Sequence, residues 1–140
     1  MSINLDRMVQ GYIDCAEWAD CGPDHETHGH DWADDVLAVM QHDCELFIAA
    51  CGEPLLDALA ELAPDYSDER FGHDFWLTRN GHGAGFWDRK ELEPKLGMAS
   101  APLGDMGQAG LELGEVLTAR AERMGGREMY VGDDGLVYTL

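Results

Sequence analysis

The uneven charge of this chain constrains its fold more than any other feature of the sequence. Its 140 residues include 28 Asp and Glu but only nine Lys and Arg, which gives a formal net charge of -19. Residues 1–70 contain 17 of the acids and only two basic residues, Arg7 and Arg70. Because like charges repel and a carboxylate is costly to bury, most of these acids must point into water from the outer faces of secondary structure.

The apolar fraction of 45% is nevertheless that of an ordinary folded protein, so the chain can still bury a core. At this length we expect one domain, 1–140. It would consist of an acidic helical half (1–70) and a hairpin–helix–hairpin half (71–140).

In the first half, apolar residues recur at helical spacing in three stretches. Asn4 is a suitable N-cap for a first helix over 4–20, which a Gly-Pro breaker ends. Asp31 is the expected N-cap of a second helix over 32–51. A third helix over 54–63 begins with a proline, which the first turn of a helix favours.

The second half begins with an aromatic stretch over 72–89, GHDFWLTRNGHGAGFWDR. Asn80-Gly81 lies near its centre, and this dipeptide is a strong hairpin signal. The sequence therefore predicts strands near 74–79 and 84–88.

The rest of the chain completes the predicted architecture. Residues 90–109 are rich in Gly, Pro, Ala and Met and predict a loop, a helix follows over 110–124, and two strands surround Asp133-Asp134-Gly135. This order predicts an α+β fold in which a small antiparallel sheet of three to four strands, formed by two hairpins, packs against three to four helices. The residues expected in or beside the sheet core are Trp76, Phe86, Trp87, Tyr130 and Val131.

The cysteines and the loop histidines are the residues of this sequence that could bind a metal ion. Cys15, Cys44 and Cys51 have apolar helical neighbours and are interpreted as small core residues. Ligand types that zinc prefers cluster at Cys15, Cys21, His25, His28 and His30. Their spacing matches no standard zinc pattern, so a solvated polar loop is the favoured interpretation and a metal site the alternative. We expect no cofactor.

A second set of chemical groups gathers around the predicted hairpin, at His73, Asp74, Arg79, Asn80, His82 and Asp88. Such groups can support acid–base or phosphodiester chemistry. Strand alternation and turn geometry explain the same residues structurally, so a catalytic or binding tip remains the alternative. Asp133-Asp134-Gly135 lacks the twelve-residue calcium pattern and predicts a tight turn. Because the sequence has no nucleophile elbow, P-loop or HExxH motif, we expect that the protein is not an enzyme.

Three segments resemble a family of small acidic proteins encoded by bacteriophages and other mobile elements. They are GHDFWLTRNGHGAGFWDR at 72–89, LGEVLTARAERMGG, and MYVGDDGLVY at 129–138, with a fainter echo in QGYIDCAEWAD of the first helix. The resemblance implies a phage or prophage product that acts inside a bacterium, and it brings no catalytic residues. The His-rich loop and the segment near 90–109 depart from the family's usual form.

Charge and resemblance together predict a protein that binds another protein. An acidic field repels nucleic acid and anionic membranes and attracts basic surfaces. We expect an inhibitor of a basic, nucleic-acid-handling host protein, of the anti-CRISPR or anti-restriction type, that imitates the charges of DNA. A solvated acidic surface with no partner is the simpler alternative. The residues expected to bind the partner are Asp20, Asp31, Asp34, Asp35, Asp43, Glu45, Arg79 and His82.

The expected location is the cytoplasm of the bacterial host. The first ten residues lack a signal peptide, and no apolar stretch approaches the length of a membrane span. In that compartment the cysteines would stay reduced.

Overall fold

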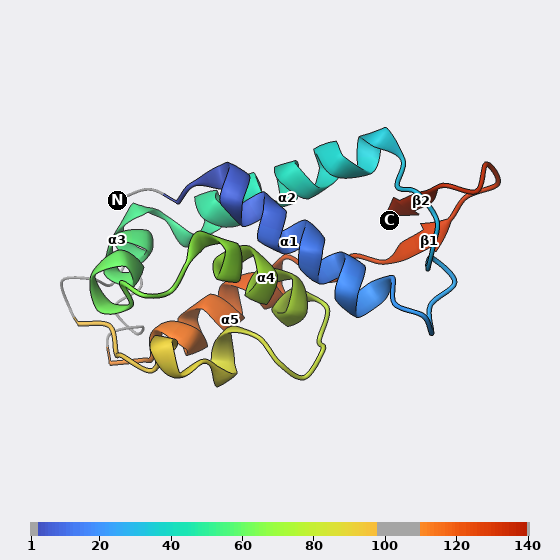
Figure 1. Ribbon diagram of the computed structural model, residues 1–140. Coiled ribbons are helices and arrows are strands. Elements are labelled where there is room, and N and C mark those ends of the chain that lie inside the picture. Colours follow the sequence, from blue (N-terminus) through green and yellow to red (C-terminus); the bar gives the residue numbers. More distant parts are fainter. Residues whose placement is uncertain (1–2, 98–109, 140) are drawn as a thin grey trace.

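Helices make up most of this protein (Figure 1). A computed structural model describes residues 3–97 and 110–139. Its helices are α1 (Leu5–Asp20), α2 (Asp34–Cys51), α3 (Glu53–Leu62), α4 (Asp68–Arg79), the short 3-10 helices η1 (Phe86–Asp88) and η2 (Lys90–Leu92), and α5 (Leu113–Arg123). Two short strands follow, β1 (Met129–Val131) and β2 (Val137–Thr139). No helix in the described ranges is both long and apolar enough to cross a membrane.

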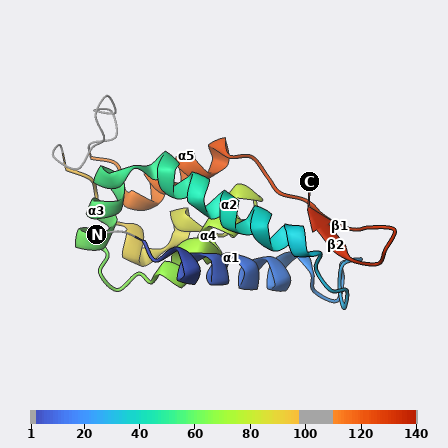
Figure 2. The same ribbon diagram turned by 90° about the horizontal axis from the view of Figure 1, so that it is seen from above.

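The predicted fold class is wrong, because the described residues form a single two-stranded sheet. β1 and β2 pair antiparallel around the predicted turn at Asp133-Asp134-Gly135, which confirms the second hairpin. Figures 1 and 2 both place this hairpin at one end of the helices and α3 at the other. A layer of helices, not a sheet, therefore provides the core.

The first predicted hairpin is replaced by α4. Ser67 caps this helix, since its hydroxyl accepts a hydrogen bond from the backbone N–H of Arg70. The helix ends at Arg79 with Asn80 as its C-cap, and Gly81 adopts a φ of 65°, the left-handed conformation that often terminates helices. Asn80-Gly81 is thus a helix stop. Of the second predicted strand, residues 86–88 form the 3-10 helix η1.

The first-half helices follow the sequence closely. Asn4 caps α1 as predicted, accepting a hydrogen bond from the backbone N–H of Arg7. The start of α2 differs, because Ala33 and not Asp31 is its N-cap. Residues 31–33 are extended and bond to the last strand: the Val137 N–H donates to the Asp31 carbonyl, and the Ala33 N–H donates to the Val137 carbonyl. Because residues 31–33 pair with Val137, α2 begins two residues later than predicted.

In the C-terminal half, the predicted helix over 110–124 is confirmed as α5. The predicted loop over 90–109 is only partly described. It begins with the 3-10 turn η2, and residues 98–109 lie outside the described residues.

Two glycines allow α1 and α4 to pack backbone against backbone. A Cβ on Gly11 would lie 1.9 Å from the Glu69 carbonyl oxygen, and a Cβ on Gly72 would lie 1.9 Å from that of Met8. Asn4 and Asp20, at opposite ends of α1, bond to Asp68 and Trp76 of α4 respectively. The two helices therefore run in the same direction, side by side (Figure 2).

An aromatic cluster fills the space between α1, α2, α4 and η1. Phe47 of α2 stacks on Phe75 of α4 with ring centroids 4.1 Å apart. The fully buried aromatic residues are Tyr12, Phe47, Phe71, Phe75, Trp76 and Phe86. The core prediction holds for Trp76 and Phe86 but is wrong for Trp87 and Tyr130, which are 54% and 37% exposed.

Candidate functional site

Asp43, a predicted surface residue, lies inside the protein. It sits on the inner face of α2 with 1% of its surface exposed. Its carboxylate forms ion pairs with Arg79, at 3.0 Å, and with Arg127, at 2.7 Å, and it accepts a hydrogen bond from the Tyr12 hydroxyl at 3.1 Å. Arg79 is also buried, and donates to Tyr12 and to the carbonyls of residues 124 and 125. Asp43 and Arg79 are therefore internal links between the helices and the chain leading to β1, and the partner-binding role expected of them has to be withdrawn.

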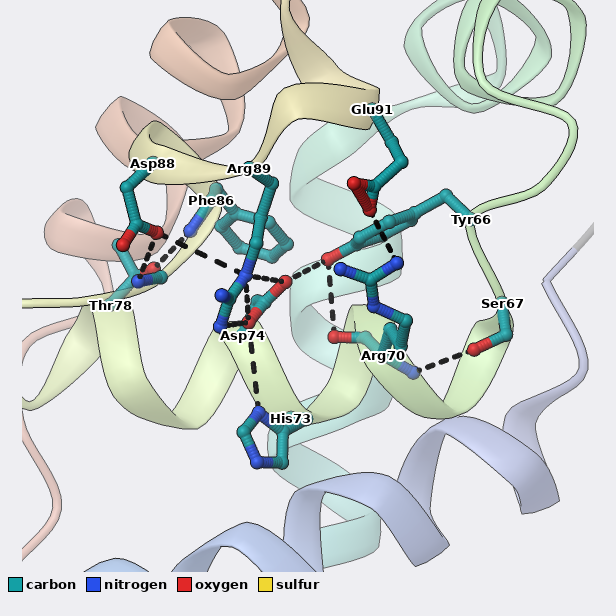
Figure 3. A network of polar contacts seen from close by, with 11 residues as sticks. Tyr66, Ser67, Arg70, His73, Asp74, Thr78, Phe86, Asp88, Arg89 and Glu91 are labelled. Atoms are coloured by element: carbon teal, nitrogen blue, oxygen red, sulfur yellow. Dashed lines mark hydrogen bonds and ion pairs between the residues drawn. The ribbon is translucent and has the colours of Figure 1, made fainter.

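A second buried carboxylate, Asp74, lies at the centre of the network in Figure 3. Arg89 donates to both of its oxygens, with distances of 2.7 to 3.1 Å, and the Tyr66 hydroxyl donates at 2.5 Å. Burial alone raises the pKa of Asp74, but hydrogen bonds from His73, Arg89 and Tyr66 outweigh it and leave the pKa below its ordinary value. Asp74 is therefore ionised, and its carboxylate holds η1 and the neighbouring residues against α4.

Beside this network lies a cleft of about 570 Å³, which is a common size for a ligand site. It separates the end of α1 and the following loop from α4 and the segment after it. Its walls include Trp18, Asp24, His25, His73, Leu77, His82 and Arg89. The structure thus brings His73 and His82 to one cleft, as the alternative interpretation, a catalytic or binding site in this segment, required. The two histidines lie on a helix and the loop after it, and not on the predicted hairpin.

Asp20 and His82 form a polar pair beside the cleft. The Asp20 Oδ2 atom accepts hydrogen bonds from the Trp76 indole, at 2.5 Å, and from His82 Nε2, at 2.9 Å. Because the Trp76 ring is buried in the core, it fixes the carboxylate in place. With Nε2 donating to Asp20, Nδ1 of His82 carries the free lone pair. This arrangement can hold and move a proton.

Trp18 is the unexpected member of the cleft. Its side chain is 71% exposed although it is large and apolar. One face of the indole stacks on the His73 ring, with centroids 6.1 Å apart and an interplanar angle of 27°. The helical spacing of α1 gave a signal for it, because Trp18 lies two residues after the buried Ala16, which places it about 200° around the helix from that residue.

The remaining predicted partner-binding acids are on the surface. Asp31, Asp34, Asp35 and Glu45 are exposed along the start and the outer side of α2. Further exposed acids lie on α1 and the following loop, at Asp6, Asp14, Glu17, Asp24 and Glu26, and Glu17 lines a shallow pocket together with Asp31. We call these nine residues the acidic face. None of them forms an ion pair with another described residue.

Most arginines are engaged elsewhere. Arg7 pairs with Glu69, Arg70 with Glu91 and Arg89 with Asp74, while Arg79 and Arg127 share Asp43. Five of the nine basic side chains are thus held by acids outside the acidic face. Its negative charge is left without local compensation.

The His-rich loop is tied down by its own histidines. His28 donates to the Cys21 carbonyl at 3.0 Å, and His30 donates to the Gly135 carbonyl of the terminal hairpin at 2.8 Å. No group of three or more His, Cys, Asp or Glu side chains within residues 3–97 and 110–139 is arranged to hold a metal ion. The histidines serve to position the loop.

The cysteines are free thiols, and the predicted core positions are confirmed. Cys15, Cys44 and Cys51 are buried, and Cys21 is partly exposed. Burial raises the pKa of Cys15 and of Cys51 to about 12, and also raises that of Cys44. A thiol that stays protonated at neutral pH is a poor nucleophile and metal ligand.

Comparison of the chain with protein-family models, with curated proteins and with solved structures found no match.

Proposed function

We propose that this protein binds a basic, nucleic-acid-handling protein of a bacterial host through its acidic face and inhibits it. The observation that carries the proposal is the lack of ion-pair partners for the nine acids of this face, while arginines elsewhere are paired. Net charge alone is also explained by solubility, but a local concentration of unpaired carboxylates favours a basic partner.

The helical scaffold supports imitation of a nucleic acid. Asp34 and Glu45 lie on the same side of α2, separated by about 16 Å along the helix axis at 1.5 Å per residue. A rigid helix presents these charges in a fixed order, as a DNA strand presents its phosphates. A groove lined with Lys and Arg that accepted the acidic face would then be closed to nucleic acid. We propose a host defence effector as the target, as the phage-encoded origin expected from the sequence of residues 72–89 would imply.

A capture experiment followed by competition tests this proposal. The tagged protein is used to isolate host proteins, and each candidate is assayed for exclusion of DNA or RNA. We expect fast binding that weakens with salt. A variant with Asp31, Asp34, Asp35 and Glu45 all changed to Lys should bind at least about 10-fold more weakly.

The matched control carries the same change of net charge elsewhere, with Glu53, Glu61, Asp65 and Glu115 changed to Lys. These four side chains are exposed and lie outside the acidic face. The control should retain most of the affinity. If both variants lose affinity equally, only the net charge matters and a specific acidic interface is rejected.

The Asp20–His82 pair favours a second candidate function, hydrolysis by proton transfer in the cleft. Turnover of a phosphodiester probe such as bis(p-nitrophenyl) phosphate distinguishes the two. Under the binding proposal we expect no turnover. Activity that disappears in His82→Ala and persists in His42→Ala, an exposed histidine on α2, would instead identify a hydrolase.

A further inference from the structure

Trp18 is the most exposed large apolar side chain among the described residues. Its position is nevertheless fixed, because the inner face of the indole stacks on His73 at the wall of the cleft. A fixed aromatic ring loses little conformational entropy when a partner binds, and tryptophan is enriched among the residues that dominate binding energy. The outer face of the Trp18 indole is thus an ordered apolar surface that no other described residue covers.

The charges around Trp18 select the kind of occupant. Asp14 lies one helical turn before it on the same side of α1, and Asp24 lines the cleft. The guanidinium of Arg89 also lines the cleft, but Asp74 already neutralises it through both carboxylate oxygens. The carboxylates are therefore the uncompensated permanent charges near the indole, beside the three histidines of the cleft wall, and they favour a cation and disfavour a phosphate.

We propose that the cleft beside Trp18 receives an arginine side chain of the basic partner. This inference rests on the proposed function and names the chemistry of its central contact. A guanidinium is planar, stacks on an indole face and donates in a fork that matches a carboxylate. Trp18 supplies the face, and Asp24 in the cleft wall supplies a carboxylate. Asp14 lies outside the cleft walls, one turn earlier on α1, and adds a second exposed carboxylate that also accepts a hydrogen bond from Gln10. A lysine has the charge but lacks both the plane and the fork.

Two peptides of equal charge test the inference: a hexamer of arginine and a hexamer of lysine. Their affinities for the intact protein are measured by calorimetry at about 0.15 M salt, where long-range attraction is screened. We expect the arginine peptide to bind about 5- to 10-fold more tightly, as a partly desolvated cation–π contact allows. Trp18→Ala should reduce the two affinities to the same value.

The matched control is Trp87→Ala, which removes the other strongly exposed tryptophan, 54% exposed and outside the cleft walls. It should keep the arginine preference. The variant with Asp31, Asp34, Asp35 and Glu45 changed to Lys should bind both peptides more weakly while keeping the ratio of their affinities. Circular dichroism checks that each variant is folded.

The outcomes separate the inference from the function it rests on. Equal affinity of the intact protein for both peptides, or a preference that survives Trp18→Ala, rejects the arginine site and leaves the acidic interface standing. If neither peptide binds, the arginine site and the acidic interface are both rejected. Binding of adenosine monophosphate that depends on Trp18 would make the cleft a nucleotide site and overturn the inference.

Discussion

At the scale of single residues, two carboxylates behave against the overall charge pattern. Most acids point into water, but Asp43 and Asp74 are each about 1% exposed and bind arginines from distant parts of the chain. Buried ion pairs of this kind add little net stability compared with apolar packing, but breaking one is costly. They fix the C-terminal segment and η1 in position.

Asp43→Asn should therefore destabilise the protein strongly. The change removes the negative charge that faces Arg79, whose side chain is 4% exposed, and leaves that guanidinium buried without its counter-ion. We expect the free energy of unfolding to fall by about 3–5 kcal/mol in urea titrations. Asp35→Asn, on the exposed side of the same helix, should change it by less than about 0.5 kcal/mol. A similar small effect for Asp43→Asn would show that the buried network is absent in solution.

The ionisation of Asp74 predicts how the stability of the protein changes at acidic pH. Its pKa is lower in the folded protein than the ordinary value near 4, so its ionised form contributes stability above about pH 4 and that contribution is lost as the pH falls through the folded pKa. The difference in unfolding free energy between the parent and Asp74→Asn should be largest near neutral pH and shrink below about pH 4. A difference that stays constant from pH 7 to pH 2 would mean that ionisation of Asp74 does not matter.

The sequence contained a signal for the burial of Asp43. Val36, Met40, Asp43 and Phe47 repeat at helical spacing along the inner face of α2. Assigning Asp43 to the surface followed its residue type instead of its position. The burial of Arg79 had no such signal, because its location depends on α4, which was interpreted as a strand.

At the scale of elements, local signals predicted α1, α3, α5 and the terminal hairpin, all of which have clear caps, breakers or turns. The failure at α4 arose because aromatic residues and Asn80-Gly81 favour strands and hairpins in isolation. The competing signal was Ser67 followed by two acids, with Phe71 and Phe75 one turn apart. Packing of those rings against α2 decided between the alternatives, and tertiary packing is not readable from a short window.

The cleft was missed as a unit for the same reason. Its walls come from the end of α1, from α4 and from the loop after α4. His73 and His82 were grouped correctly, but Trp18 and Arg89 enter only when α4 lies parallel to α1. That contact depends on Gly11 and Gly72, which carry no side chain to reveal it.

The α1–α4 contact predicts that Gly72→Ala destabilises the fold, although alanine favours helices. The new Cβ would overlap the Met8 carbonyl oxygen, and a backbone atom cannot turn aside. We expect a loss of about 1–3 kcal/mol or more in thermal or urea unfolding. Gly97→Ala is the control, because a Cβ there meets nothing within 4 Å. If Gly72→Ala were as stable as Gly97→Ala, the two helices could not be as close as described.

At the scale of the whole molecule, repulsion arising from the net charge of -19 destabilises the folded state, whereas the ion pairs of the arginines stabilise it. Unpaired carboxylates on the acidic face repel one another, and dissolved salt screens this repulsion over a Debye length of about 10 Å at 0.1 M salt. The buried pairs of Asp43 and Asp74 are screened much less, because water and ions do not reach them. Salt should therefore weaken repulsion more than attraction.

We expect the melting temperature to rise by about 3–6 °C between about 0.02 M and 0.5 M sodium chloride, which corresponds to roughly 1–2 kcal/mol for a protein of this length. Calorimetry or circular dichroism measures the shift. The variant with Asp31, Asp34, Asp35 and Glu45 changed to Lys lowers the repulsion at its source, so its melting temperature should respond less to salt. A melting temperature that falls as salt is added would show that exposed ion pairs such as Arg7–Glu69 outweigh the repulsion, and that the acidic face imposes no cost on the folded state.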